Sequence, residues 1–118
     1  MTQADEQPFW TRLDRLVQES TVVVDRPRGA RHPRFPELVY PMDCGYLAET
    51  RTTDDGGVDV WLGSLAEWRV TSALITVDTL KRDVEIKLLV GCTPDEARLA
   101  CAHASQPSQS ALLVVRSP

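Results

Sequence analysis

The spacing of apolar residues predicts a helix near each end of the chain. Between Pro8 and about Gln18, four apolar residues recur at helical intervals: Phe9, Leu13, Leu16 and Val17. Pro8 suits the first helical position, where its missing N–H is not needed. The segment from Thr93 to Glu96 combines an N-cap residue, a proline and first-turn acids, so a second helix is expected to run from there to about Ala104.

Short runs of β-branched and aromatic residues between these helices predict strands. The expected strands are Thr21–Val24, Leu38–Tyr40, Tyr46–Arg51, Val58–Leu62, Arg69–Val77, Glu85–Val90 and Ala111–Val115. Short strands separated by turn signals are typical of small barrels. The expected fold is therefore α+β and mainly β, with a small barrel of five or six strands and a helix near each end of the chain.

The segment Val58–Leu62 shows the alternation most clearly. Its pattern places Val58, Val60 and Leu62 on one face of the strand, and Asp59 with Trp61 on the other. Aspartate is unfavourable inside a strand on propensity alone. Asp59 is therefore either simply solvated or kept there for a function.

Size and charge narrow the class of protein. The chain has 118 residues, which fits one domain over 1–118, and its net charge of −4 argues against non-specific binding to nucleic acid. The N-terminal segment has no basic and apolar signal pattern, and no apolar run reaches the length of a membrane span. Three cysteines at no metal-ligand spacing favour reduced thiols, so a cytoplasmic protein is expected.

A proline-rich basic loop precedes the central strands. The segment from Asp25 to Glu37 holds four arginines and three prolines. Guanidinium groups bind phosphate oxygens in pairs, and prolines restrict the loop that presents them. Arg31 and Arg34 are the candidate phosphate ligands of this loop. The alternative is a solvated basic loop with no ligand.

Acidic residues cluster at the turn before Val58. Asp54 and Asp55 lie in this turn, and Asp59 follows in the strand. Mg²⁺ prefers hard oxygen ligands and is held by a few carboxylates together with substrate phosphates. Asp-Gly-Gly between two strands is also an ordinary hairpin signal, although that reading leaves Asp59 unexplained.

The segment from Thr76 to Gly91 places acids beside bases. Glu85 and Lys87 lie on one face of the expected strand, where a metal-bound phosphate could contact both. The alternative is an exposed strand face with paired charges.

The order of these motifs resembles the soluble, magnesium-dependent family I inorganic pyrophosphatases. The resemblance spans about 22–91 and depends on the segments "VYPMDCGYL", "DDGGVDVWLG" and "DVEIKLLVG". It implies a small closed barrel of the OB type with a polar active-site cavity. It also implies hydrolysis of pyrophosphate with Mg²⁺, in which metal ions clamp phosphoryl oxygens and activate a water.

The resemblance also assigns roles to residues. Asp54, Asp59 and Glu85 match metal-binding acids, and Lys87 matches a phosphate-binding lysine. Tyr40 matches an active-site tyrosine, whereas Tyr46 matches a more structural one. Arg34 lies near the position of a phosphate-binding lysine of the family, and Arg31 is the alternative for that position. The resemblance implies catalytic roles for Tyr40, Asp59 and Asp55. Asp55 is included because it precedes the position of the family's middle acid.

Two departures from the family pattern keep a second function open. Gly56 occupies the position of the middle acid, which in the family helps to activate water, and Cys44 occupies that of a second tyrosine. The leading hypothesis is a Mg²⁺-dependent hydrolase of pyrophosphate or a related diphosphate. The alternative is a pyrophosphatase-like module that binds a small phosphorylated ligand or serves as a scaffold, without hydrolysis.

The tryptophans leave two further questions open. Trp61 or Trp68 could act as stacking platforms in an OB-type binder of single-stranded nucleic acid, which the acidic charge makes the weakest hypothesis. Trp10 and Trp61 are also candidates for the interface of a homo-oligomer, or equally for the core.

Overall fold

The computed structural model describes residues 5–53 and 56–118 of the chain. Its two helices are α1 (Gln7–Glu19) and α2 (Pro94–Ala104). Its six strands are β1 (Val22–Arg26), β2 (Asp43–Leu47), β3 (Val58–Leu62), β4 (Val70–Asp78), β5 (Asp83–Val90) and β6 (Gln109–Val115). The α+β class and the two helices near the ends of the chain are thereby confirmed.

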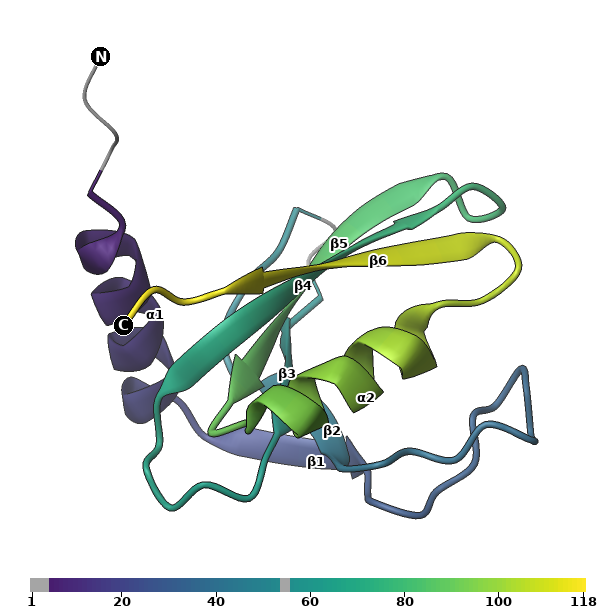
Figure 1. The fold of residues 1–118 in the computed structure, drawn as a ribbon, viewed down its shortest axis with the longest axis horizontal. Helices are drawn as coiled ribbons and strands as arrows, with labels where there is room; N and C mark the ends of the chain where they lie inside the picture. Colours follow the sequence, from purple (N-terminus) through teal and green to yellow (C-terminus); the bar gives the residue numbers. More distant parts are fainter. Residues whose placement is uncertain (1–4, 54–55) are drawn as a thin grey trace.

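The strands form one mixed sheet in the order β1-β2-β3-β5-β4-β6 (Figure 1). The pairing of β3 with β5 is parallel, and the other four pairings are antiparallel. Within residues 5–53 and 56–118, no strand pairing joins β1 to β6. The sheet therefore has two edges in the described part of the chain, and the expected closure into a barrel is not seen.

The two helices cover opposite faces of the sheet and define two cores. Trp10 and Val17 of α1 pack with Leu47, Val60 and Leu88. The alanines of α2 pack on the other face, with a group that includes Tyr40, Cys44, Trp61, Leu74 and Leu89. The alternation expected in Val58–Leu62 is confirmed, because Val60 and Trp61 belong to different cores.

Both tryptophans that were candidates for an interface belong to the core. Trp10 is 1% exposed and Trp61 is 2% exposed. Trp10 also donates its indole N–H to Glu6 Oε1 at 3.0 Å. Because Trp61 is buried, it cannot offer its ring to a nucleic acid base.

Local sequence signals predicted the positions of both helices correctly. The α2 helix begins with a capping box, in which Glu96 N–H donates to Thr93 Oγ1 at 3.1 Å and Thr93 N–H donates to Glu96 Oε1 at 2.9 Å. This reciprocal pair satisfies backbone donors that a helix start leaves without partners. The helix ends at Ala104, as expected.

The strand expected at Leu38–Tyr40 is wrong. Val39 makes only an isolated bridge with Arg31. The loop bonds to itself instead: Tyr40 N–H donates to Ala30 O, and Gly29 N–H donates to Tyr40 O, both at 2.9 Å. These bonds use the backbone groups that a strand would have offered to the sheet.

The strand expected at Tyr46–Arg51 lies earlier in the chain, as β2 (Asp43–Leu47). It ends at a turn in which Glu49 has a φ of 62°, a left-handed conformation that no strand contains. Thr50 Oγ1 donates to Leu47 O at 2.7 Å and fixes this turn.

Within the described residues, no helix combines the length and the apolar character needed to cross a lipid bilayer.

A buried ion pair fastens α1 to the sheet. Arg116 Nη1 lies 2.8 Å from Asp14 Oδ2, and the two side chains are mostly shielded from solvent. Asp14 Oδ1 also accepts a hydrogen bond from Val70 N–H at 2.8 Å. One carboxylate thus joins the first helix, the start of β4 and the segment after β6.

We expect Asp14→Ala to lower the free energy of unfolding by about 3 kcal/mol, because the Arg116 charge would stay buried without a partner. Urea denaturation measures this loss. Glu19→Ala, which removes the exposed Arg15–Glu19 pair of the same helix, is the control and should cost less than about 1 kcal/mol. Similar losses in the two variants would contradict the importance given to the buried pair.

Candidate functional site

The parallel pairing of β3 with β5 sets Asp59 directly opposite Lys87. Lys87 Nζ lies 3.3 Å from Asp59 Oδ2 and 4.0 Å from Glu85 Oε2. Glu85 and Lys87 share one face of β5 because they are two positions apart. A lysine thus stands between two carboxylates, one from each strand.

The environment keeps Lys87 charged. Burial by itself would lower the Lys87 pKa, but the neighbouring Asp59 and Glu85 outweigh it and raise the pKa above its ordinary value. The side chains of Asp59 and Glu85 are 39% and 35% exposed, so both carboxylates remain open to solvent. The cluster therefore combines a fixed cation with two accessible anions.

Cys44 lies beside this cluster. The β2–β3 register sets it opposite Trp61, and it sets Tyr46 opposite Asp59. Burial raises the pKa of the Cys44 thiol to about 11, while the nearby Lys87 acts in the opposite direction. The thiol is thus neutral at physiological pH.

Tyr40 anchors an aromatic group at the C-terminal end of α2. Its ring centroid lies 4.4 Å from that of His103, 5.7 Å from that of Trp61 and 6.1 Å from that of His32. Burial raises the pKa of Tyr40, although the nearby Arg26 and Lys87 oppose this shift. Tyr40 is therefore a neutral phenol close to two cations.

Two polar atoms of this aromatic group are buried without a partner among the described residues. They are the indole nitrogen Nε1 of Trp61 and Nε2 of His103. The two rings meet edge to face, with their centroids 5.3 Å apart. The pKa of His103 is lowered, first by burial and then by the charges of His32 and Lys87.

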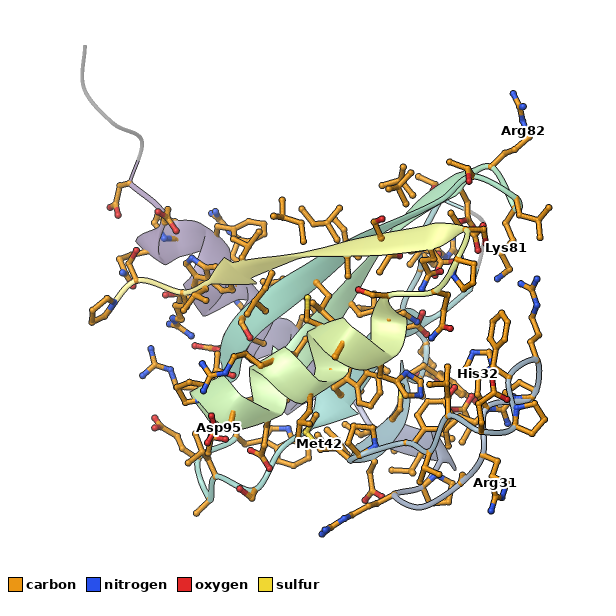
Figure 2. All side chains as sticks on the ribbon, turned by 45° about the vertical axis from the view of Figure 1, so that its right-hand side comes forward. Arg31, His32, Met42, Lys81, Arg82 and Asp95 are labelled. Atoms are coloured by element: carbon orange, nitrogen blue, oxygen red, sulfur yellow. The ribbon has the colours of Figure 1, made fainter. Side chains whose placement is uncertain are left out.

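The arginine loop is held partly by its own groups. Arg31 Nη1 donates to Pro36 O at 2.9 Å, and Figure 2 shows this side chain at the outer edge of the loop. The guanidinium of Arg34 lies 5.6 Å from the centre of the Phe35 ring. His32 is turned inward, and its Nδ1 accepts the backbone N–H groups of Arg34 and Phe35 at 3.1 and 3.2 Å.

A small cavity of about 70 Å³ lies where this loop faces the β4–β5 turn. His32, Arg34 and Lys81 line it, with Asp78 as the acidic member. Figure 2 shows His32 near α2 and Lys81 on the turn opposite the loop. Arg34 thus shares a cavity with another cation, whereas Arg31 does not line it.

The predicted site residues fall into three groups. Asp59, Glu85 and Lys87 are in contact, and Tyr40 lies near enough to Lys87 for the lysine charge to affect its pKa. Arg31 is bound to its own loop, and Arg34 lines the small cavity. Asp54 and Asp55 lie outside the described residues.

No group of three or more His, Cys, Asp or Glu side chains in residues 5–53 and 56–118 is arranged to hold a metal ion. Asp59 and Glu85 contribute two carboxylates. Two carboxylates can suffice for Mg²⁺, which keeps several waters and takes further ligands from substrate phosphates.

Sequence reasoning missed three members of this region: Arg26, His32 and His103. Arg26 was counted within the basic loop but was not singled out, although it lies at the end of β1 and influences Tyr40. The chain has only two histidines, and their rings lie 5.8 Å apart. A pair of histidines flanking the site was the available signal.

The fold is similar to that of two solved inorganic pyrophosphatases. The structure is similar to an inorganic pyrophosphatase from Helicobacter pylori, with a TM-score of 0.55, 12% identity, and coverage of 80% of this chain and 81% of that one. It is also similar to an inorganic pyrophosphatase from Coxiella burnetii, with a TM-score of 0.53, 13% identity, and coverage of 78% and 81%. No protein-family model and no curated protein matches the sequence.

The resemblance inferred from the sequence motifs is thus confirmed at the level of the fold. At 12% and 13% identity, the likeness shows the fold alone.

We expect the free energy of unfolding to fall as the pH drops below about 6.5. The pKa values of His32 and His103 are both lowered in the folded protein, so the unfolded state binds more protons in this range. Each histidine contributes a slope below about 1.4 kcal/mol per pH unit, since both remain partly solvated.

Urea denaturation of wild type and of His103→Leu measures this slope. The measurements run from about pH 7.5 to about pH 5, an interval that spans the ordinary pKa of histidine. The leucine keeps an apolar side chain in the core but cannot titrate, so the variant should lose part of the pH dependence. An unchanged slope would show that His103 does not cause it.

Proposed function

We propose that this protein is a Mg²⁺-dependent hydrolase of pyrophosphate or a related diphosphate. The observation that carries the proposal is the contact of Lys87 with Asp59 and Glu85, on a fold that it shares with inorganic pyrophosphatases. A cation between two solvent-accessible carboxylates can bind both a phosphate group and a divalent metal.

The two carboxylates supply the start of a metal site. Asp59 and Glu85 offer hard oxygen ligands from adjacent strands, and Asp54, which precedes β3 in the sequence, is the proposed third ligand. Mg²⁺, when bound, neutralises phosphate charge and makes a bound water more acidic. The proposed role of Asp55, beside Asp54, is to orient the attacking water together with Asp59.

Lys87 and Tyr40 are the proposed phosphate ligands of the sheet. Lys87 is charged and now pairs with Asp59, so a metal ion on Asp59 would free its ammonium group for phosphate oxygens. Tyr40 keeps its proton and can donate a hydrogen bond to the leaving phosphate. Of the loop arginines, Arg34 is the better placed because it lines a cavity with Lys81, while Arg31 would have to leave Pro36.

A second candidate function is the binding of a small phosphorylated ligand without hydrolysis. The observation that favours it is Cys44, whose buried neutral thiol stands where the resembled family has a tyrosine. Gly56 likewise offers no carboxylate to activate water. Under either function we place the protein in the cytoplasm, where its three free cysteines would stay reduced.

We expect purified protein to release phosphate from pyrophosphate when Mg²⁺ is present. Asp59→Asn should lower the turnover rate about 100-fold or more, because it removes both a metal ligand and the partner of Lys87. A phosphate-release assay measures the rate. Asp95→Asn, an exposed acid of α2, is the control and should stay within about twofold of wild type.

Calorimetry with pyrophosphate separates the two candidate functions. Binding without phosphate release at high protein concentration would overturn the hydrolase and leave the binding module. The absence of both binding and release would overturn both candidates.

Gly56, which stands at the position of the family's middle acid, gives an independent prediction. If the site hydrolyses diphosphates slowly because this position lacks an acid, Gly56→Asp should raise turnover about tenfold. This is less than the full contribution of a well-placed general base. Gly56→Asn has the same shape without the charge and should not raise it. Equal rates in the two variants would argue against a missing base.

A further inference from the structure

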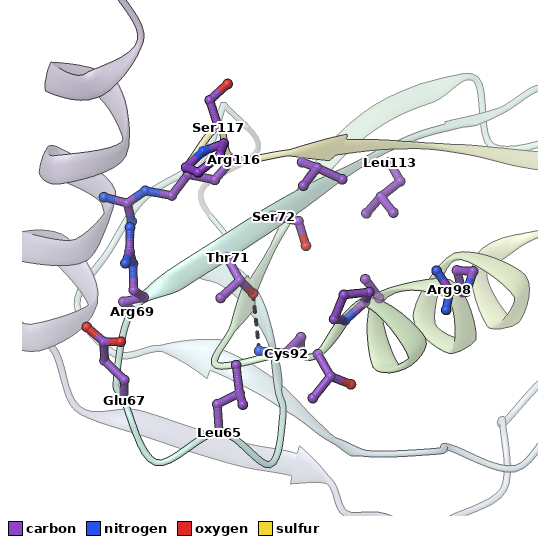
Figure 3. A pocket seen from close by; sticks show the side chains of 15 residues that line it. Leu65, Glu67, Arg69, Thr71, Ser72, Cys92, Arg98, Leu113, Arg116 and Ser117 are labelled. Atoms are coloured by element: carbon purple, nitrogen blue, oxygen red, sulfur yellow. Dashed lines mark hydrogen bonds between the residues drawn. The ribbon is translucent and has the colours of Figure 1, made fainter.

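A cavity that is separate from the proposed active site lies among residues 65–72, 92–98 and 113–118. Its volume is about 390 Å³, within the range of small-molecule sites. It is bounded by the first turns of α2, by β4 and β6, and by the loop after β3 (Figure 3). The Lys87 cluster and the aromatic group of Tyr40 and His103 do not line it.

Most of its wall is apolar. Ala97 contributes from α2, Leu113 and Val115 from β6, and Leu65 from the loop after β3. A few placed polar groups on an apolar wall are typical of sites for small organic ligands.

Ser72 gives this cavity an unsatisfied polar group. The residue is only 2% exposed, and its Oγ has no hydrogen-bond partner among the described residues. Figure 3 shows the hydroxyl directed into the cavity, whereas the neighbouring Thr71 Oγ1 is engaged with Cys92 N–H at 3.1 Å. Buried hydroxyls are nearly always hydrogen-bonded, so the Ser72 hydroxyl is available to a polar atom of a ligand or to a water in the cavity.

Arginines give one end of the cavity a positive charge. Arg69 and Arg116 lie side by side there in Figure 3, and Nε of Arg116 is the second buried atom of the cavity without a partner in the described residues. Arg116 is already paired with Asp14, and Arg98 on α2 is paired with Asp95. Arg69 forms no ion pair in residues 5–53 and 56–118, even though Glu67 is nearby on the same wall.

We propose that this cavity is a binding site for a small organic acid with an apolar body and a second polar group. The carboxylate pairs with Arg69, the apolar body lies against Leu65, Ala97 and Leu113, and the second polar group hydrogen-bonds to Ser72 Oγ. A single free guanidinium suits a carboxylate, which it can bind through two parallel hydrogen bonds. A phosphate would bring a higher charge into a mostly apolar wall, where burial of charge is unfavourable.

Matched probes test each part of this ligand in the protein of 118 residues. 4-Hydroxyphenylacetate has both polar groups, phenylacetate lacks the hydroxyl, and tyrosol lacks the carboxylate. Amide NMR titration should give saturable shifts around Ser72, Arg69 and Leu113, with the weakest binding for tyrosol. The aliphatic pair 8-hydroxyoctanoate and octanoate tests whether a chain fits better than a ring.

Two variants separate the polar contacts. Arg69→Gln should abolish the preference for 4-hydroxyphenylacetate over tyrosol, and Ser72→Ala should abolish its preference over phenylacetate. Each loss is expected to be about tenfold in affinity, as for one charged or polar contact. Arg98→Gln is the matched control, because its guanidinium is already held by Asp95, and it should bind like wild type.

Several results would overturn the proposal. One is the absence of saturable shifts with any probe, which would leave the cavity as a hydrated hollow. Equal binding of the acids and tyrosol would remove the role of Arg69. Because none of these readouts uses phosphate release, the outcome is independent of the proposed hydrolase.

Discussion

The parallel pairing of β3 with β5 is the constraint on which the site depends. Neighbouring strands in a sheet lie about 4.8 Å apart, so the register decides which side chains can touch. Here it sets Asp59 opposite Lys87, and the alternation of β5 brings Glu85 to the same face. A shift of one residue would turn Asp59 toward the core of α1 and Val60 toward the face of α2, so burial and chemistry select the same register.

That register is maintained by two cores rather than by the charged residues themselves. Val60 and Leu88 pack beneath α1, while Trp61 and Leu89 pack beneath α2. Exposed ion pairs contribute little to stability, and the partly exposed carboxylates of the Lys87 cluster follow this rule. The apolar residues thus fix the strands, and the charged residues are free to serve a ligand.

The sequence allowed good prediction where structure is local. The α2 helix followed from its N-cap residue, its proline and its first-turn acids, and Val58–Leu62 followed from strict alternation. The Leu38–Tyr40 strand failed because Gly29 and Ala30, which lie in the same loop, bond to Tyr40. No local pattern could show which strand lies beside β3, because β4 intervenes in sequence between the two partners.

The site residues also divide into those that the sequence could identify and those that depend on the tertiary structure. Asp59, Glu85 and Lys87 were found through a resemblance whose motif order preserves their positions, although their contact is a tertiary one. His103 lies on a helix with no motif to mark it, and it meets Tyr40 only because α2 packs across β3. Residues of this kind become visible only when the two faces of the sheet are known.

The buried polar atoms without partners give α2 a specific role in this arrangement. In the described residues there are four such side-chain atoms, and they belong to two regions. Trp61 Nε1 and His103 Nε2 belong to the aromatic group near the last turn of α2. Ser72 and Arg116 line the cavity that the first turns of α2 help to bound, with Arg116 on the side of α1. Natural proteins keep few groups of this kind, because each one lowers stability unless something binds it. The small alanines of α2 let it pack closely on the sheet between these two regions. The helix therefore separates the proposed phosphate site from the cavity, and a ligand at either end would meet polar groups that the fold leaves unsatisfied.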